Sequence, residues 1–402
     1  MLTNKKIVLG VTGGIAAYKA AELIRALIQK GAQVKVIMTK NALEFITPLT
    51  MRTLSQNQVY TDMFIPADKF DIAHIELAEF ADAFVIAPAT ANIIGKITAG
   101  IGDDLLSTTI MAQDKPTLIC PAMNDKMLAN PVVQDNISKL KKLGYIFMES
   151  AEGELACKTK GKGRLPDIED IVEATTNLLT PKDLKGSRIL VTAGPTEEPL
   201  DPVRFITNLS SGKMGYALAT AAQRRGADVT LVSGPTNLTP PSVEKIIKVR
   251  TAKEMYQVVM DQYRKATIII KAAAVADYCP SATAEEKIKK DKKNIFLELK
   301  NNPDIIAEVG KNKGNRILVG FAMETRNLLD NAREKLKKKN MDLIVANNLR
   351  EEGAGFRTDT NVITIIDRAG QTEALGKMTK MEAADAILDR VKKMIKKNNR
   401  KK

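Results

Sequence analysis

The chain repeats one local pattern in both of its halves: an apolar strand, a glycine-containing turn, a helix that ends in glycine, and a second strand. In the first half, the strand Lys6–Val11 is followed by Thr12-Gly13-Gly14, and Gly31 separates the helix from the strand Val34–Met38. Apolar strands that alternate with helices are typical of parallel sheets covered on both faces. The pattern therefore predicts a doubly wound α/β domain.

The second half begins the pattern again with a strand at Arg188–Ala193, a helix at Met214–Arg225 and a strand at Val229–Ser233. Its helix-to-strand junction, Ala222–Val229, is similar to Leu27–Val34. We therefore predict an α/β fold with two doubly wound parallel-sheet domains, flavodoxin-like in residues 1–180 and Rossmann-like in residues 187–402, with a linker at 181–186. Further predicted elements are strands at Ala83–Ala87, Thr117–Cys120, Thr267–Ala273, Ile317–Phe321 and Leu343–Ala346, a helix at Ile168–Leu179, an antiparallel extension at Asn361–Leu375, and a final helix from about Thr379.

Composition narrows the class of protein. Three cysteines without a CxxC pair and a single histidine argue against a disulfide framework or a zinc site, and they favour a reducing compartment. No apolar run reaches the ~18–20 residues of a membrane span, and the first residues lack the organisation of a signal peptide. We therefore expect a cytoplasmic protein that does not insert into membranes.

The formal net charge of +14 raises the question of nucleic-acid binding. The basic residues gather in Lys287–Lys293, Arg333–Lys339 and Lys392–Lys402, there is no tryptophan, and aromatic residues make up 4% of the chain. Solvated helix faces and a basic tail explain most of this charge, and phosphorylated small molecules could use the rest. Nucleic acid is a minor alternative, and we expect no nucleic-acid partner.

The turn after the first strand is a candidate phosphate site, because Gly13 and Gly14 leave backbone N–H groups exposed where a helix begins. The second strand ends in Thr39-Lys40, where a dinucleotide site would usually place an acidic residue for the ribose. NAD is therefore disfavoured, and a mononucleotide such as FMN fits better.

Polar residues follow other predicted strands, in the segments Ala87–Asn92, Gly102–Leu105 and Pro121–Met127, where such folds bind ligands. The single histidine, His74, stands near the predicted start of a helix. Cys157 lies in a segment with two glycines and four basic residues, which suggests a mobile flap that brings a thiol to an anionic ligand.

These first-half segments together resemble the homo-oligomeric flavin-containing cysteine decarboxylase family. In the second half, Val191–Pro199 and Thr207–Gly215 resemble the signature stretches of phosphopantothenate–cysteine ligase. From about Lys5 to Lys396 the chain is similar to the bifunctional decarboxylase and ligase family of coenzyme A biosynthesis.

The resemblance implies that FMN oxidises the substrate thiol, which eases loss of the neighbouring carboxylate. His74 matches an active-site histidine, Asn124 matches the asparagine that binds the carboxylate, and Cys157 matches the thiol that returns a proton. The residues expected to hold FMN are Gly13, Gly14, Thr39, Ala89, Thr90 and Asn92. Leu128 departs from the family, which often has tryptophan there, and so does Lys158-Thr159-Lys160.

For the second half, the resemblance implies that CTP activates 4′-phosphopantothenate with Mg²⁺ and that cysteine displaces CMP. Lys287 matches the lysine that forms the acyl-cytidylate, and Asn208 matches the asparagine that acts on it. The other residues expected to bind substrate or nucleotide are Ser210, Ser211, Gly212, Ala273, Ala274, Asp277, Asn302, Pro303, Asp304, Ile305, Phe321, Lys335 and Lys339. The family also implies a homo-oligomer, with trimeric flavin domains and dimeric ligase domains in a dodecamer.

Two further interpretations compete with this one. A flavin-binding regulator without catalysis could use the same first domain, although the presence of His74, Asn124 and Cys157 argues against it. An FMN decarboxylase of peptides with a C-terminal cysteine is the other, and it leaves the ligase-like half without a role.

Overall fold

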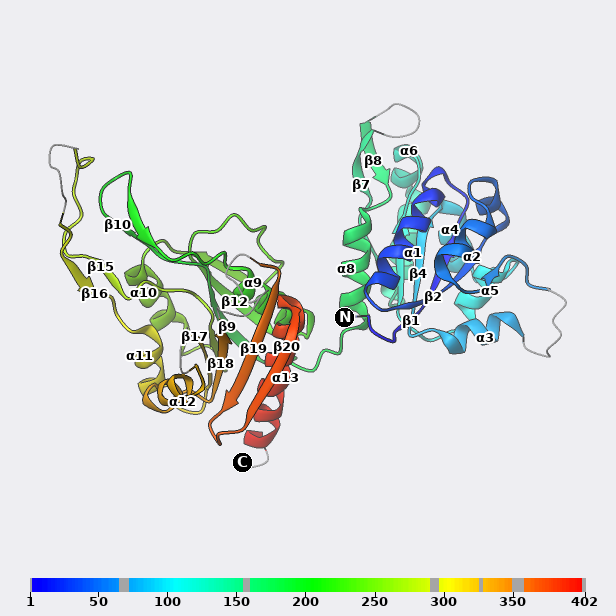
Figure 1. The fold of residues 1–402 in the computed structure, drawn as a ribbon. Coiled ribbons are helices and arrows are strands. Elements are labelled where there is room, and N and C mark those ends of the chain that lie inside the picture. Colours follow the sequence, from blue (N-terminus) through cyan, green and yellow to red (C-terminus); the bar gives the residue numbers. More distant parts are fainter. Residues whose placement is uncertain are drawn as a thin grey trace. The chain divides into compact units, whose positions relative to one another are not determined.

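A computed structural model describes residues 2–64, 72–154, 160–289, 296–324, 328–348 and 358–399 (Figure 1). The chain divides into two compact units, Met1–Thr180 and Pro181–Lys402. Cys157, predicted to supply a thiol, lies outside the described residues.

The first unit is built on a six-stranded parallel sheet in the order β3-β2-β1-β4-β5-β6. Because β2 and β3 lie on one side of β1 and β4 to β6 on the other, the direction of winding reverses between β1 and β4. The strands are β1 (Lys6–Val11), β2 (Gln33–Met38), β3 (Val59–Tyr60), β4 (Ala83–Ala89), β5 (Thr117–Pro121) and β6 (Ile146–Phe147).

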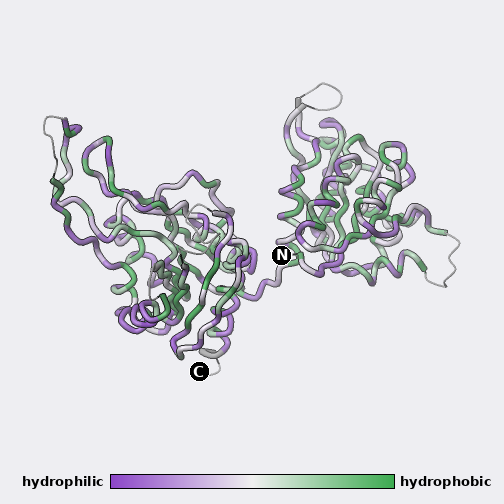
Figure 2. The backbone as a smooth tube through the Cα atoms, viewed as in Figure 1, coloured by the Kyte–Doolittle hydropathy of each residue, from purple (hydrophilic) through white to green (hydrophobic). Residues whose placement is uncertain are grey.

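Two apolar cores cover the two faces of this sheet. Alternate residues of β1 serve each of them, since Ile7 and Leu9 pack in one core and Val8 packs in the other. Figure 2 shows apolar residues running along the strands and polar ones on the outer helices. The helices are η1 (Ile15–Tyr18), α1 (Lys19–Gln29), η2 (Lys40–Glu44), α2 (Pro48–Ser55), α3 (Ala73–Phe80), α4 (Ala91–Ala99), α5 (Leu105–Met111), α6 (Asp125–Ala129), α7 (Pro131–Lys142) and α8 (Ile168–Leu179). A hairpin of β7 (Ala151–Glu154) and β8 (Lys160–Arg164) completes the unit.

The second unit repeats that strand order and extends it. Its sheet runs β13-β12-β9-β14-β17-β18 in parallel and continues with the antiparallel strands β19 and β20, and α13 lies against this extension beside α9 (Figure 1). The strands are β9 (Arg188–Ala193), β12 (Asp228–Ser233), β13 (Lys245–Lys248), β14 (Ile268–Lys271), β17 (Ile317–Glu324), β18 (Leu343–Asn348), β19 (Thr360–Asp367) and β20 (Thr372–Thr379). The helices are α9 (Lys213–Arg224), α10 (Ala252–Gln262), α11 (Ile305–Asn312), α12 (Leu328–Lys338) and α13 (Lys380–Asn399), and two small hairpins pair β10 (Glu197–Pro199) with β11 (Phe205–Thr207) and β15 (Tyr278–Pro280) with β16 (Leu299–Asn301).

The predicted fold class is confirmed, and most predicted strands agree with the observed ones within two or three residues. The edge strands β3, β6 and β13 were not predicted from the sequence. They are only two to four residues long, which is too short to give a periodic or apolar signal of a strand. None of the helices in the described ranges is both long and apolar enough to cross a lipid bilayer.

Residues 181–186, interpreted above as a linker, include side chains that pack into the second unit. Leu184 is 0% exposed within the core of that unit, and its N–H donates to the carbonyl of Arg225. Burial alone would raise the pKa of Asp183, yet ion pairs with Arg225 and Lys392 lower it. Because the stretch is otherwise polar, its sequence gives no sign that Leu184 attaches it to the second unit.

We expect Leu184→Ala to destabilise only the second unit, by about 2–5 kcal/mol, because it leaves a cavity in that core. Leu179→Ala is the matched control, since Leu179 packs against a core of the first unit. Hydrogen–deuterium exchange of peptides from each unit during urea titration would separate the two effects. A loss of protection in residues 5–40 of the Leu184→Ala variant would contradict the assignment of Leu184 to the second unit.

Candidate active sites

A buried threonine organises the reversal point of the first sheet. Thr12, directly after β1, is 2% exposed, and its Oγ1 donates to the carbonyl of Pro88 at 2.7 Å. The same oxygen accepts the N–H of Thr90 at 3.1 Å. Both hydrogen bonds join the end of β1 to the end of β4, where parallel α/β sheets bind their ligands.

The residues predicted to hold FMN lie around this link. Only glycine fits at position 13, because a Cβ on Gly13 would lie 2.3 Å from Cβ of Asn41. Gly14 is open instead, since a Cβ on it would meet Cγ2 of Thr90 at 3.7 Å. Thr39 donates its N–H to the carbonyl of Val11 at the end of β1. The structure thus brings Gly13, Gly14, Thr39, Ala89 and Thr90 to the ends of three adjacent strands, with Asn92 in the first turn of α4.

The chemistry of this group suits an anion. Gly14 is the N-cap of η1, whose first N–H groups face away from the helix body, and the two threonines add hydroxyl groups. The six side chains include no acid that would repel a phosphate. These residues therefore fit a phosphorylated mononucleotide.

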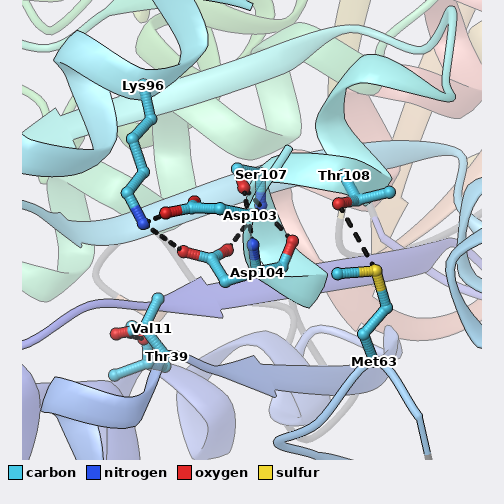
Figure 3. A network of polar contacts seen from close by, with 8 residues as sticks. All are labelled: Val11, Thr39, Met63, Lys96, Asp103, Asp104, Ser107 and Thr108. Atoms are coloured by element: carbon cyan, nitrogen blue, oxygen red, sulfur yellow. Dashed lines mark hydrogen bonds and ion pairs between the residues drawn. The ribbon is translucent and has the colours of Figure 1, made fainter. Parts of the chain in front are cut away.

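A polar network fixes the loop between α4 and α5 near the same strand ends (Figure 3). Lys96 pairs with Asp103 at 2.7 Å and Asp104 at 2.9 Å, and Asp104 accepts the N–H of Ser107 in a capping box that starts α5. Burial alone would lower the pKa of Lys96, but these two carboxylates raise it. The loop predicted to lie beside the ligand is therefore held in one conformation.

Asn124 lies where the β7–β8 hairpin is attached. The N–H of Met123 donates to the carbonyl of Gly163 at 3.0 Å, and a Cβ on Gly163 would lie 2.1 Å from the Met123 carbonyl oxygen. Asn124 accepts the N–H of Lys126 with its Oδ1 and caps α6. The two strands that flank residues 155–159 are thus anchored beside Asn124. Leu128, the departure from tryptophan, packs against the apolar core under β5.

His74 lies in the first turn of α3 and is half-buried. The same helix carries Glu76, whose carboxylate pairs with Lys35 of β2, so α3 is tied to the sheet. α3 packs against β1 and α5.

The second unit contains a cavity of about 690 Å³ at the ends of β14 and β17. It is lined by most of the residues predicted to bind nucleotide or substrate in this unit, together with others: Asn208, Lys271, Ala273–Tyr278, Asn301–Ile306, Phe321, Met323, Lys335, Lys339, Met341 and Ile344. Residues from five separate stretches of sequence therefore meet at one site.

Side-chain amides and hydroxyls shape the wall of this cavity. Asn208 donates to the carbonyl of Ala274 at 3.0 Å, and Asn302 donates to that of Ala276 at 2.9 Å. The hydroxyl of Thr192 accepts the N–H of Ala273 at 3.2 Å. Because Ala273, Ala274 and Ala276 have small side chains, a ligand can approach the backbone of this stretch closely.

Three lysines line this cavity beside the carboxylates of Asp277 and Asp304. Lys335 and Lys339, which the sequence analysis expects to bind nucleotide, line it, and Lys339 pairs with Asp304 at 2.9 Å. Lys271 was not predicted. Burial lowers the pKa of Lys271 to about 8, and the charge of Lys339 acts in the same direction. A bound polyanion would restore the charge that burial disfavours.

A smaller cavity of about 170 Å³ adjoins the larger one and shares Ala273, Ala274, Phe321 and Met323 with it. Ser210, Ser211 and Gly212 line it, and Gly212 has φ +79° as the N-cap of α9. Asn347, Asn361 and Lys380 complete its wall and were missed from the sequence. Asn347 is 6% exposed, and among the described residues its Oδ1 has no hydrogen-bond partner. An acceptor buried in this way is suited to a ligand's donor group.

Lys287 is placed differently from the other predicted residues. It is exposed, and it lies outside the lining of both cavities. It belongs to residues 283–289, which we call the strap. The strap is bound along β10 and the following turn, since the Thr283 hydroxyl donates to Pro199 O and Ala284 N–H donates to Leu200 O.

Comparison with known proteins assigns both units. Residues 1–180 match the family model described as Flavoprotein, and residues 184–395 match that of the DNA/pantothenate metabolism flavoprotein C-terminal domain. The coenzyme A biosynthesis bifunctional protein CoaBC of Bacillus subtilis (strain 168) is 47% identical over 395 residues, which cover 97% of each chain. The chain belongs to this bifunctional family. The resemblance to the decarboxylase and ligase of coenzyme A biosynthesis is thereby confirmed.

Two further similarities complete the comparison. A cysteine/cysteine sulfinic acid decarboxylase from an unknown prokaryotic organism is 46% identical over 353 residues, covering 86% of this chain and 98% of that protein. The crystal structure of the C-terminal domain of a bifunctional CoaBC protein is 40% identical, covers 54% of this chain and 99% of that one, and has a TM-score of 0.47.

Lys271 was not predicted as a site residue, although its place in the sequence is unusual. A lysine that ends a strand of three isoleucines is an anomaly in a buried run, and that was the available signal. Asn347, Asn361 and Lys380 gave no such signal. They come from β18, β19 and α13, which meet only in the folded sheet.

We expect Gly13→Ala to destabilise the first unit by about 1–3 kcal/mol, because the new methyl group collides with the backbone and Cβ of Asn41. Gly14→Ala is the matched control and should cost only a few tenths of a kcal/mol, since φ there is −158° and the space is open. Urea unfolding monitored by exchange of residues 5–20 measures both. Equal losses would contradict the described turn.

We expect polyanion binding in the second unit to weaken above pH 8, because Lys271 loses its proton there and a bound anion favours the protonated form. Calorimetry with inorganic tripolyphosphate between pH 7 and 9.5 tests this. Relative to Lys271→Arg, which stays charged, wild-type affinity should fall by up to about tenfold per pH unit above 8. Lys335→Met should weaken binding at every pH without changing that slope. Parallel pH profiles of wild type and Lys271→Arg would exclude a role for Lys271.

Proposed function

We propose that the second unit ligates cysteine to 4′-phosphopantothenate through an acyl-cytidylate made from CTP. The first unit then decarboxylates the product, 4′-phosphopantothenoylcysteine, to 4′-phosphopantetheine with FMN. The observation that carries this proposal is the 690 Å³ cavity, which is lined by all eleven of the predicted catalytic, substrate- and nucleotide-binding positions of this unit outside the Ser210–Gly212 turn and the strap. Membership of the bifunctional family supports both activities.

Ligation requires that a carboxylate become an electrophile. In the proposed reaction a carboxylate oxygen of the substrate attacks the α-phosphorus of CTP and pyrophosphate leaves. The amine of cysteine then attacks the acyl carbon, and CMP leaves. Lys271, Lys335 and Lys339 supply positive charge along the triphosphate, and Ser210–Gly212 offer hydroxyl and N–H groups to a phosphate at the start of α9.

Mg²⁺ is expected to enter with the triphosphate. Within the ranges that the structure describes, no group of three or more His, Cys, Asp or Glu residues lies close enough to hold a metal. This composition suits a cation that is bound mainly by phosphate oxygens and water, with one carboxylate from the protein. Asp277, which lines the larger cavity and is exposed, is the candidate for that carboxylate.

In the first unit, the fit of the glycine turn and the threonine hydroxyls to a phosphate supports FMN. A bound flavin supplies reversible two-electron chemistry that no side chain can supply. Asn124 would bind the substrate carboxylate with a neutral amide, because a cation would stabilise that group and oppose its loss. His74 would accept or orient the thiol proton, and Cys157 would return a proton at the end.

The decisive assay supplies 4′-phosphopantothenate, cysteine and one nucleoside triphosphate at a time. We expect carbon dioxide release to require CTP. We expect Cys157→Ser to stop after about one equivalent per flavin and to retain an oxidised, decarboxylated product, because the closing proton is missing. Mass spectrometry of the bound product measures this.

A control with free amino acids distinguishes decarboxylation of 4′-phosphopantothenoylcysteine from decarboxylation of free cysteine or cysteine sulfinic acid. Free cysteine and cysteine sulfinic acid should release no carbon dioxide without the phosphopantothenoyl group. Release from free cysteine, or turnover of 4′-phosphopantothenate without any triphosphate, would contradict the proposed function.

A further inference from the structure

Asp201 is a buried carboxylate with an unusual set of partners. It lies in the turn between β10 and β11, and its side chain is 0% exposed. Its Oδ1 accepts the N–H groups of Val203 at 2.8 Å and Arg204 at 2.7 Å, which closes the turn locally. Its Oδ2 accepts Nε of Arg204 and, at 3.2 Å, the N–H of Ile288. One carboxylate therefore bonds two segments that lie 87 residues apart in sequence.

These two segments carry both predicted catalytic residues of the ligase unit. β11 leads directly into Asn208, which is held against the cavity wall through Ala274. Ile288 follows Lys287 in the strap. The guanidinium of Arg204 also donates to the carbonyl of Ile288, so the strap is bound through both its N–H and its C=O. This junction therefore joins the segment that leads to Asn208 with the strap that carries Lys287.

The turn alone does not require a carboxylate. Closing a turn needs one acceptor oxygen, which asparagine also provides. The second oxygen accepts hydrogen bonds from the strap and from Arg204, and the negative charge pairs with the Arg204 guanidinium. Burial by itself would raise the pKa of Asp201, yet three backbone N–H groups lower it to about 2, so the charge persists at any physiological pH.

We propose that Asp201 is a positioning residue for ligation: it fixes the strap so that Lys287 is held in a defined place relative to Asn208 and the nucleotide. This inference rests on the proposed function. It assigns no substrate contact to Asp201, which acts through the strap. Small displacements of a reacting group lower the rate more than they lower binding, so the effect should appear in the rate of activation.

Asp201→Asn tests the junction selectively. The amide keeps one oxygen for the local turn, but its NH₂ faces two donors, Arg204 Nε and the Ile288 N–H, and cannot accept from either. Asp367→Asn is the matched control, because Asp367 also closes a turn in this unit with its Oδ1, accepting Ala369 and Gln371 N–H groups. Ile288→Pro is the second variant, since it removes the strap donor and leaves the carboxylate intact.

Two readouts are required. In Asp201→Asn and Ile288→Pro, we expect faster hydrogen exchange of residues 284–289 with unchanged exchange in α9 to α13, which shows that the unit is folded. Pyrophosphate release from CTP and 4′-phosphopantothenate without cysteine should fall roughly 10- to 100-fold, while the Kd for CTP stays within about twofold. Asp367→Asn should match the wild type in both readouts.

Accelerated exchange of the strap with an unchanged rate of pyrophosphate release would overturn the inference, and so would an equal loss of rate and CTP affinity. A wild-type protein that releases no pyrophosphate with CTP would contradict the proposed function and the catalytic part of the inference together. The exchange difference between Asp201→Asn and Asp367→Asn would then remain, which distinguishes the two failures.

Discussion

Both units depend on the same interaction. In each, a buried threonine hydroxyl at the end of the first strand bonds the chain at the end of an adjacent strand, β4 in the first unit and β14 in the second. Thr12 contacts both Pro88 and Thr90 at the end of β4, and Thr192 accepts the N–H of Ala273 after β14. At a reversal of winding the loops diverge, so their backbone groups lose sheet partners. A hydroxyl that would be costly to bury unpaired satisfies these groups and holds both loops. The residues predicted to bind ligands lie on the two loops that these hydrogen bonds hold together.

The units use this shared arrangement for different chemistry. In the first, glycines and threonines leave a neutral surface with N–H donors, and the acidic side chains nearby are engaged by Lys96. In the second, β19, β20 and α13 add a wall that supplies Asn361 and Lys380 to the smaller cavity, while α12 brings lysines to the larger one. A neutral site suits loss of a carboxylate, and a cationic site suits a triphosphate.

How much could be predicted depended on whether the signal was local. Strands such as Lys6–Val11 and Arg188–Ala193, and the helix Ile168–Leu179, were read directly from apolar runs and periodicity. Residues 181–186 were read as a linker because one leucine among polar residues gives no periodic signal, although Leu184 is fully buried. Asn347 and Lys380 were missed because no stretch of sequence places them beside one another, whereas Lys271 had a local signal, a lysine after three isoleucines, that was not interpreted. Lys287 was found by resemblance, but its place on the strap, outside the cavity lining, required the structure.

The sequence by itself determined most of the longer elements and their order, the repetition of one topology in two units, and the family, but not the short edge strands. Apolar periodicity, glycine turns and short signature stretches carry this information. The tertiary structure alone decided which distant groups meet: Asp201 with Ile288, Lys339 with Lys271, and two cavities with a shared wall. The physical reason is that burial and hydrogen-bond partners are properties of packed surfaces. The pKa of Lys271 is lowered because segments remote in sequence exclude water around it, whereas buried Asp201 keeps its charge because N–H groups of the local turn and of the remote strap bond its carboxylate.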